Sequence, residues 1–87
     1  MTTKQVNWKT FAGLVEGSLE KAYFVRADLD GAFKEIRSIV NDNLELYVDA
    51  QYIQRFRVNI KTVGRIIHID LKHGLNTLCH WETSCRA

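Results

Sequence analysis

Histidine and cysteine, the side chains best suited to hold a transition metal or to move a proton at neutral pH, occur only near the end of this 87-residue sequence. They are His68, His73, Cys79, His80 and Cys85. Structural zinc sites usually take two ligands from one tight turn, as in CxxC or HxxxH pairs. Neither spacing occurs here. We therefore predict no metal site and no cofactor.

A metal-free ribonuclease would use histidines as acid and base, with a cation beside them to hold the phosphate. His68, His73 and His80 lie near Arg65 and Lys72 in the sequence, but no spacing forces two histidines together. The glycines fit neither of the nucleotide-binding patterns GxxxxGK[ST] and GxGxxG. We assign no catalytic residue and expect no enzyme, with a small ribonuclease as a lesser alternative.

Positive charge is concentrated in the second part of the chain. Residues 1–50 hold six basic and eight acidic residues, whereas residues 51–87 hold six basic residues against Asp70 and Glu82 alone. The net charge of +2 for the whole chain therefore divides into −2 and +4. A concentration of this kind is typical of a surface that binds a polyanion.

Composition is that of a globular protein, with 46% hydrophobic and 25% charged residues. No apolar run approaches the ~18 residues of a membrane span, and the first ten residues, MTTKQVNWKT, are too polar for a secretory signal. Two cysteines are few for a disulfide-stabilised small domain. We expect one domain over residues 1–87, located in the cytoplasm, with no membrane partner.

Two helices are predicted in the first half of the chain. The first covers residues 8–21 or extends beyond, with Asn7 as its N-cap, because apolar residues recur there at helical spacing. Residues 23–25 either continue it or begin a short strand. The second begins after Asp28 or Asp30 and ends at residues 41–43. Its apolar stripe comprises Leu29, Phe33, Ile36, Ile39 and Val40.

Alternating apolar residues then predict strands over residues 44–49, 56–60 and 67–71. Residues 75–83 suit either a helical turn or a last strand, and we favour the strand. The predicted fold is α+β, with two N-terminal helices packed on one face of a three- or four-stranded antiparallel sheet. The expected core comprises Phe33, Ile36, Val40, Leu46, Val48, Phe56, Val58, Ile60, Ile67, Ile69 and Leu71.

The two strands around Gly64 are predicted to pair as a hairpin, with residues 62–65 as the connection. Placing apolar side chains opposite one another pairs Ile60 with Ile67, Val58 with Ile69, and Phe56 with Leu71. The other face then pairs Asn59 with His68, Arg57 with Asp70, and Arg55 with Lys72. The same rule pairs the 44–49 strand with the hairpin, setting Val48 against Phe56, Asp49 against Arg55, and Tyr47 against Arg57.

We therefore predict a small, non-enzymatic nucleic-acid-binding protein, with RNA favoured over DNA because no recognition helix is evident. Tyr47 is expected to stack on a base. The other predicted contacts are Arg55, Arg57, Lys61, Arg65, His68, Lys72 and His73. The alternative is a protein-binding inhibitor or antitoxin-like module. Both functions are typical of phage or mobile-element accessory proteins. We also expect a homodimer, because a small sheet has exposed edges.

Overall fold

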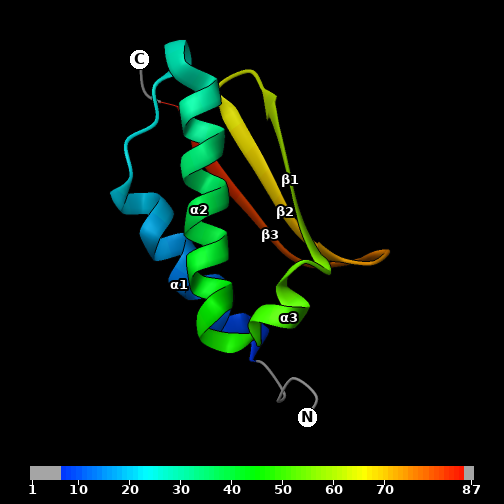
Figure 1. Ribbon diagram of the computed structural model, residues 1–87. Helices are drawn as coiled ribbons and strands as arrows, with labels where there is room; N and C mark the ends of the chain where they lie inside the picture. The colour runs from blue at the N-terminus through cyan, green and yellow to red at the C-terminus, as the bar shows by residue number, and fades with distance from the viewer. Residues whose placement is uncertain (1–6, 86–87) are drawn as a thin grey trace.

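The computed structural model describes residues 7–85 and has the predicted α+β composition, with helices followed by a three-stranded antiparallel sheet. The elements are α1 (Trp8–Lys21), the 3₁₀ helix η1 (Arg26–Asp28), α2 (Leu29–Tyr47), the short α3 (Ala50–Ile53), β1 (Phe56–Val63), β2 (Ile66–His73) and β3 (Asn76–Ser84). Figure 1 shows α1 and α2 side by side, with the sheet next to them. None of the described helices is long and apolar enough to cross a bilayer.

The first helix begins where the sequence predicts and ends at Lys21. The Asn7 side-chain oxygen accepts hydrogen bonds from the backbone N–H groups of Lys9 and Thr10, at 3.1 and 3.2 Å. These bonds satisfy two of the donors that a helix N-terminus leaves unpaired. The helix then presents Phe11, Val15 and Leu19 to the core, at intervals of four residues.

The second helix is capped as predicted but is longer. Asp28 accepts a 3.0 Å hydrogen bond from the Gly31 backbone N–H. The helix then continues through residues 41–43 to Tyr47. Asn43 lies within the helix, and its side-chain amide donates a 2.8 Å hydrogen bond to the Ile39 carbonyl one turn earlier. The predicted strand over residues 44–49 is therefore wrong.

Helical spacing of the buried residues explains this error. Ile36, Val40 and Leu44 are four residues apart, and each is completely buried. Leu46, expected in the core, is 76% exposed. Leu44 and Val48 are buried four residues apart, and the exposed Leu46 between them makes the sequence alternate as a strand would. The cross-strand pairs predicted for residues 47–49 do not form.

The β1–β2 hairpin forms, but its register differs by two residues from the prediction. Val63 pairs with Ile66, leaving Gly64 and Arg65 as a two-residue turn. Gly64 has a φ of +63°, which suits the first central residue of such a turn. The observed pairs on the apolar face are Thr62 with Ile67, Ile60 with Ile69, Val58 with Leu71, and Phe56 with His73.

The last strand forms as favoured, over Asn76–Ser84. It follows β2 through a second two-residue turn, in which Gly74 has a φ of +62°. Sheet order is β1-β2-β3, so the chain returns to the adjacent position at each turn. A register irregularity between Leu71 and Lys72 leaves Leu78 without a paired residue on β2.

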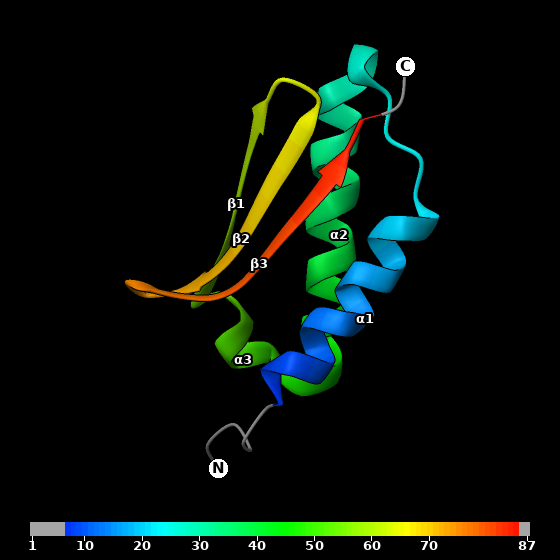
Figure 2. The same ribbon diagram turned by 180° about the vertical axis from the view of Figure 1, so that it is seen from behind.

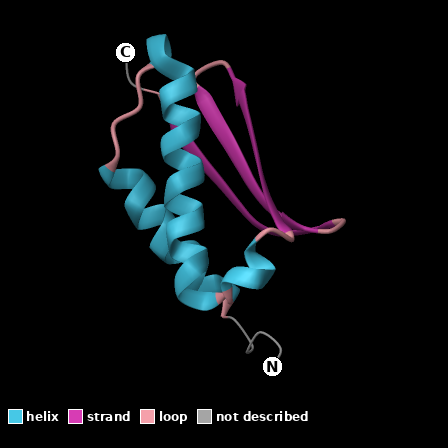
Figure 3. Cartoon of the chain, in the orientation of Figure 1, coloured by secondary structure: helices cyan, strands magenta, loops and turns pink. Residues whose placement is uncertain are grey.

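Helices and sheet contribute to one hydrophobic core. The Trp81 indole N–H on β3 donates a 3.0 Å hydrogen bond to the Ala12 carbonyl on α1, and Figure 2 shows these two elements next to each other. Figure 3 shows that the helices lie on the same side of the sheet. The buried residues are Phe11, Val15, Leu19, Phe24, Ala32, Ile36, Val40, Leu44, Val48, Ile67, Ile69, Leu71, Cys79, Trp81 and Cys85. Four expected core residues, Phe33, Phe56, Val58 and Ile60, are only partly buried and pack against this cluster.

Candidate functional site on the open face of the sheet

Side chains alternate between the two faces of each strand, so the sheet has an inner face and an open face. On β2, Ile67, Ile69 and Leu71 are completely buried against the core. The residues between them are accessible and point the other way. The residues of the open face considered below are Arg57, Asn59, Lys61, His68, Asp70, Lys72, His80 and Glu82.

Three cations lie on the β1–β2 half of this face, and we call Arg57, Lys61 and Lys72 the cationic patch. Arg57 is directly opposite Lys72, and Lys61 is opposite His68. The predicted pairing of Arg57 with Asp70 is wrong, because the register is shifted. Among residues 7–85, every ion pair joins a histidine to a carboxylate. The three cations of the patch therefore have no carboxylate partner within this part of the chain.

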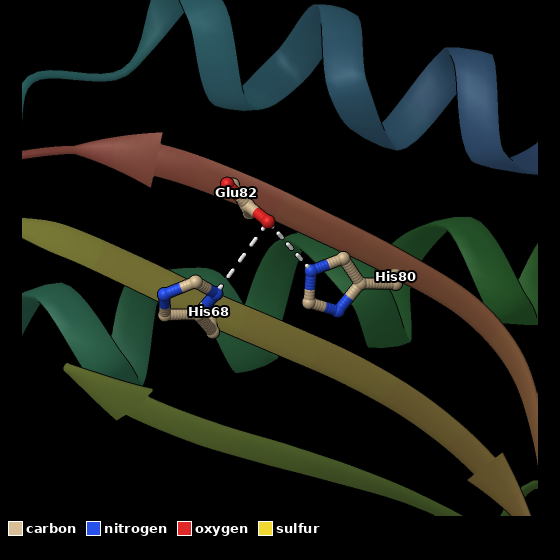
Figure 4. A group of neighbouring side chains, drawn as sticks. All are labelled: His68, His80 and Glu82. Carbon is tan, nitrogen blue, oxygen red and sulfur yellow. Dashed lines mark hydrogen bonds and ion pairs between the residues drawn. The ribbon is translucent and has the colours of Figure 1, made fainter. Parts of the chain in front are cut away.

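The β2–β3 half of the same face holds a different arrangement, which we call the histidine–carboxylate cluster: His68, Asp70, His80 and Glu82. His68 is opposite Glu82, and Asp70 is opposite His80. The four side chains thus occupy neighbouring positions on two adjacent strands. Figure 4 shows the Glu82 carboxylate between the two imidazole rings.

Short contacts hold the cluster together. His80 Nδ1 lies 2.6 Å from Asp70 Oδ1, and His80 Nε2 lies 3.1 Å from Glu82 Oε2. The same Glu82 oxygen is 3.6 Å from His68 Nδ1. The His68 and His80 ring centroids are 5.8 Å apart. The sequence spacing left these two histidines unconnected, and the β2–β3 register brings them together.

His80 is the titratable group that this environment changes most clearly. Hydrogen bonds to Asp70, and then to Glu82, raise the pKa of the imidazole above its ordinary 6.5, although slight desolvation opposes them. Ionised carboxylates only accept hydrogen bonds, so the two short contacts require a proton on each ring nitrogen. The metal-free cluster therefore favours a positively charged His80.

Two predicted contacts lie at the ends of the sheet, close to the cationic patch in sequence. Arg65 is an exposed residue of the β1–β2 turn. Arg55 precedes β1, and its guanidinium lies 5.2 Å from the centre of the Tyr52 ring. This is a cation–π contact.

The other two predicted contacts are not on the open face. Tyr47 belongs to α2, and its ring meets Phe11 edge-on at 5.8 Å. The expectation that it lies on a strand beside the basic residues is wrong. His73 is exposed at the end of β2, but its ring lies 4.8 Å from Phe56, on the side of the sheet occupied by the core residues.

The two edges of the sheet carry opposite charges, as the following two grooves show. A groove at the β1 edge is lined by Arg37 and Arg57, and Arg37 donates a 2.7 Å hydrogen bond to the Val58 carbonyl. A groove at the β3 edge is lined instead by Glu16, Glu20 and Glu82. Basic residues thus border β1 and acidic residues border β3.

Neither cysteine belongs to the site. Cys79 and Cys85 are both buried and unpaired. Burial raises the pKa of the Cys79 thiol, and a protonated thiol is a poor nucleophile and a poor metal ligand.

Asp70, His80 and Glu82 were absent from the predicted binding set. Their signal in the sequence was the i, i+2 spacing of His68 with Asp70 and of His80 with Glu82, which places each pair on one face of a strand. Recognising the cluster also requires the β2–β3 register, which the sequence does not provide because residues 75–83 suit either a helical turn or a strand.

No protein-family model, curated protein or solved structure matches this chain.

Proposed function

We propose that this protein binds nucleic acid without acting on it, with single-stranded RNA favoured over DNA. Arg57, Lys61 and Lys72 are the proposed phosphate contacts. Arg65 at the hairpin turn and Arg55 before β1 would extend this surface along the backbone of the ligand.

The observation that supports this proposal best is the pairing of Arg57 with Lys72. Like charges directly opposite one another destabilise a sheet by a fraction of ~1 kcal/mol. Two carboxylates stand on the same face, yet both are engaged by histidines. An anionic ligand would relieve the repulsion, and phosphates are the anions that neighbouring lysines and arginines commonly bind.

The shape of the surface favours RNA in a single-stranded form. Side chains on an open sheet can follow a flexible backbone, whereas reading a DNA duplex usually requires a helix or ribbon in the major groove. We assign any base stacking to the ring of His68, since Tyr47 packs against Phe11. With one partly buried imidazole as the platform, we expect weak sequence preference.

Fluorescence anisotropy with a labelled single-stranded RNA of mixed sequence tests the proposal. R57E/K61E/K72E reverses the charges of the patch. K9E/K21E/K34E reverses equally many exposed charges on α1 and α2 and serves as the matched control. We expect the first variant to lose about 100-fold or more in affinity at low salt, and the control to keep most of it. Equal losses in both variants would contradict the proposal.

A protein-binding role is the second candidate, and the β2–β3 turn favours it. Leu75, at the tip, is fully exposed, and Figure 1 shows this turn extending away from the helices. In an inhibitor or antitoxin-like module, this leucine would be a contact for the protein target. Leu75→Ser should leave RNA affinity unchanged under the first proposal, and should weaken capture of a protein partner under the second.

A ribonuclease is less favoured by the geometry. His68 and His80 do lie together, but both ring nitrogens of His80 already contact carboxylates. Those carboxylates also repel a phosphate. Incubating labelled RNA with the pure protein and with His68→Ala tests this alternative, because cleavage that depends on His68 would establish it.

We also propose a cytoplasmic location, supported by two free cysteines, and a homodimer, supported by the unpaired edges of the sheet. Arg37 occupies part of the β1 edge through its bond to Val58, so β3 is the better candidate for a strand-to-strand contact. Cell fractionation tests the location, and sedimentation velocity tests the dimer.

A further inference from the structure

We propose that the histidine–carboxylate cluster is a zinc site, in which Zn²⁺ is bound by His68 Nδ1, His80 Nε2 and Glu82 Oε2 and by a water molecule. This inference goes beyond nucleic-acid binding and does not depend on it. It also revises the sequence-based expectation of no metal site.

Two of the three donor separations are already close to the distance that zinc requires. With metal–ligand bonds of about 2.0–2.1 Å, two donors at tetrahedral positions are ~3.4 Å apart. Glu82 Oε2 lies 3.1 Å from His80 Nε2 and 3.6 Å from His68 Nδ1. One ligand atom from each of the three residues lies within 4.8 Å of those from the other two. Small side-chain rotations therefore suffice to form the site.

Asp70 supplies the support that metal-binding histidines usually have. A histidine that ligates zinc commonly donates its other ring N–H to a carboxylate, which fixes the orientation of the ring. His80 Nδ1 makes this contact with Asp70 Oδ1 at 2.6 Å, and its Nε2 is left facing Glu82. Asp70 is thus a positioning residue for His80.

The four residues of the cluster lie on a well-ordered part of the backbone. All four residues lie on the paired strands β2 and β3, and the sheet beneath them is anchored by the completely buried Ile67 and Ile69. Residues on paired strands lose little conformational entropy when the ion binds. A site assembled from flexible loops would lose more conformational entropy.

The donor set selects the class of metal. Two imidazoles with one carboxylate suit zinc and related transition metals, whereas Mg²⁺ and Ca²⁺ prefer oxygen ligands alone. Because the cluster lies on the open face, the fourth position faces solvent. Zinc sites with three protein ligands and one open position are those that bind and activate a water molecule or an anionic ligand.

Metal titration of the untagged, metal-free protein tests the proposal. Zinc affinity is measured by competition with a chromophoric chelator, and Co²⁺ reports the donor set through its visible absorption. We expect one ion per chain, with the visible bands of four-coordinate cobalt and without the intense near-ultraviolet band of cobalt–thiolate bonds.

Variants locate the ion. His68→Ala, His80→Ala and Glu82→Gln should each abolish binding at concentrations that saturate the unmodified protein. Asp70→Asn should retain binding but weaken it by about 10-fold or more, as loss of a supporting carboxylate does. His73→Ala removes a histidine elsewhere on β2 and Glu20→Gln removes a carboxylate of the neighbouring groove, so both should bind normally.

Three results would overturn the proposal. One is the absence of zinc binding by the unmodified protein at millimolar metal, and another is binding that survives His80→Ala. A cobalt–thiolate band would place the ion at the cysteines instead. Circular dichroism of each variant confirms that the sheet is intact, which is expected because the substituted side chains are accessible.

Discussion

The two halves of the open face carry ionisable side chains of similar density but arrange them in opposite ways. On the β1–β2 half, Arg57 faces Lys72, and neither has a carboxylate partner among the described residues. On the β2–β3 half, Asp70 and Glu82 both contact His80. Charge on the first half is left for an external anion, whereas the charged groups on the second half contact one another. The first half is therefore suited to phosphate, and the second to protons or a metal ion.

The central strand supports both halves, so damage to it should abolish the distinction. Ile69→Ala removes a completely buried side chain from the middle of β2. We expect the free energy of unfolding to fall by about 2–5 kcal/mol, as is usual for Ile→Ala substitutions in cores. Chemical denaturation measures the loss. RNA binding and metal binding should fail together as the protein unfolds, and selective loss of one would show that the halves are held independently.

Removing the carboxylates should sharpen the contrast by leaving the open face entirely cationic or neutral. A negative charge ~8 Å from a phosphate costs about 0.5 kcal/mol in water. D70N/E82Q removes two negative charges, but it also removes the hydrogen bonds that keep His80 positively charged. The net gain near pH 7 is therefore about one charge, and RNA affinity should rise about twofold at low salt. The same anisotropy assay measures the change. Unchanged or weaker binding would indicate that RNA approaches from another side.

Folding stability should respond with opposite sign to changes in the two halves. Arg57→Glu converts a like-charge pair with Lys72 into an attractive one, and should stabilise the protein by about 0.5 kcal/mol at low salt. Asp70→Asn removes a partner of charged His80, and should destabilise it by a similar amount at pH 6. Thermal unfolding of both variants beside the unmodified protein makes this comparison, and two shifts of the same sign would count against it.

The smallest expected effect is the titration of His80 in the metal-free protein. Because the hydrogen bonds to Asp70 and Glu82 raise its pKa above 6.5 in the folded state, its contribution to stability is complete below that pH. The contribution is lost as the pH rises through the folded-state pKa. NMR titration of the imidazole resonances measures the pKa, and Asp70→Asn should lower it. An identical pKa in this variant would show that the contact with Asp70 is not maintained in solution.

Much of the fold was predictable because its signals are local. The cap at Asn7, the helix that follows it and the cap at Asp28 were all recognisable from side-chain chemistry and helical spacing. The strands on either side of Gly64 were recognisable from their alternation. Errors arose where two periodicities fitted the same residues, as in the segment from Leu44 to Val48, in which one exposed leucine imitated a strand.

The candidate site was only partly predictable, because it depends on strand register. Pairing apolar residues opposite one another favours the wrong register, because the observed one sets Thr62 against Ile67 and Phe56 against His73. Registers two residues apart nevertheless place Arg57 and Lys61 on the same face. The length of the turn at Gly64 decides between them, and sets Arg57 against Lys72 rather than Asp70. The histidine–carboxylate cluster requires a second register, between strands whose pairing no local pattern specifies.

The salt dependence of RNA binding tests the central claim most directly, because it counts the phosphates that the protein neutralises. Each phosphate contact to a single strand contributes about −0.7 to the slope of the logarithm of the binding constant against the logarithm of the salt concentration, so three contacts predict a slope of about −2. The unmodified protein should show at least this slope, and R57Q/K61Q/K72Q should make it shallower by about 2, leaving only the contribution of Arg55 and Arg65. An affinity that does not vary with salt, or an equal slope in the two proteins, would contradict the assignment of the cationic patch as a phosphate-binding surface.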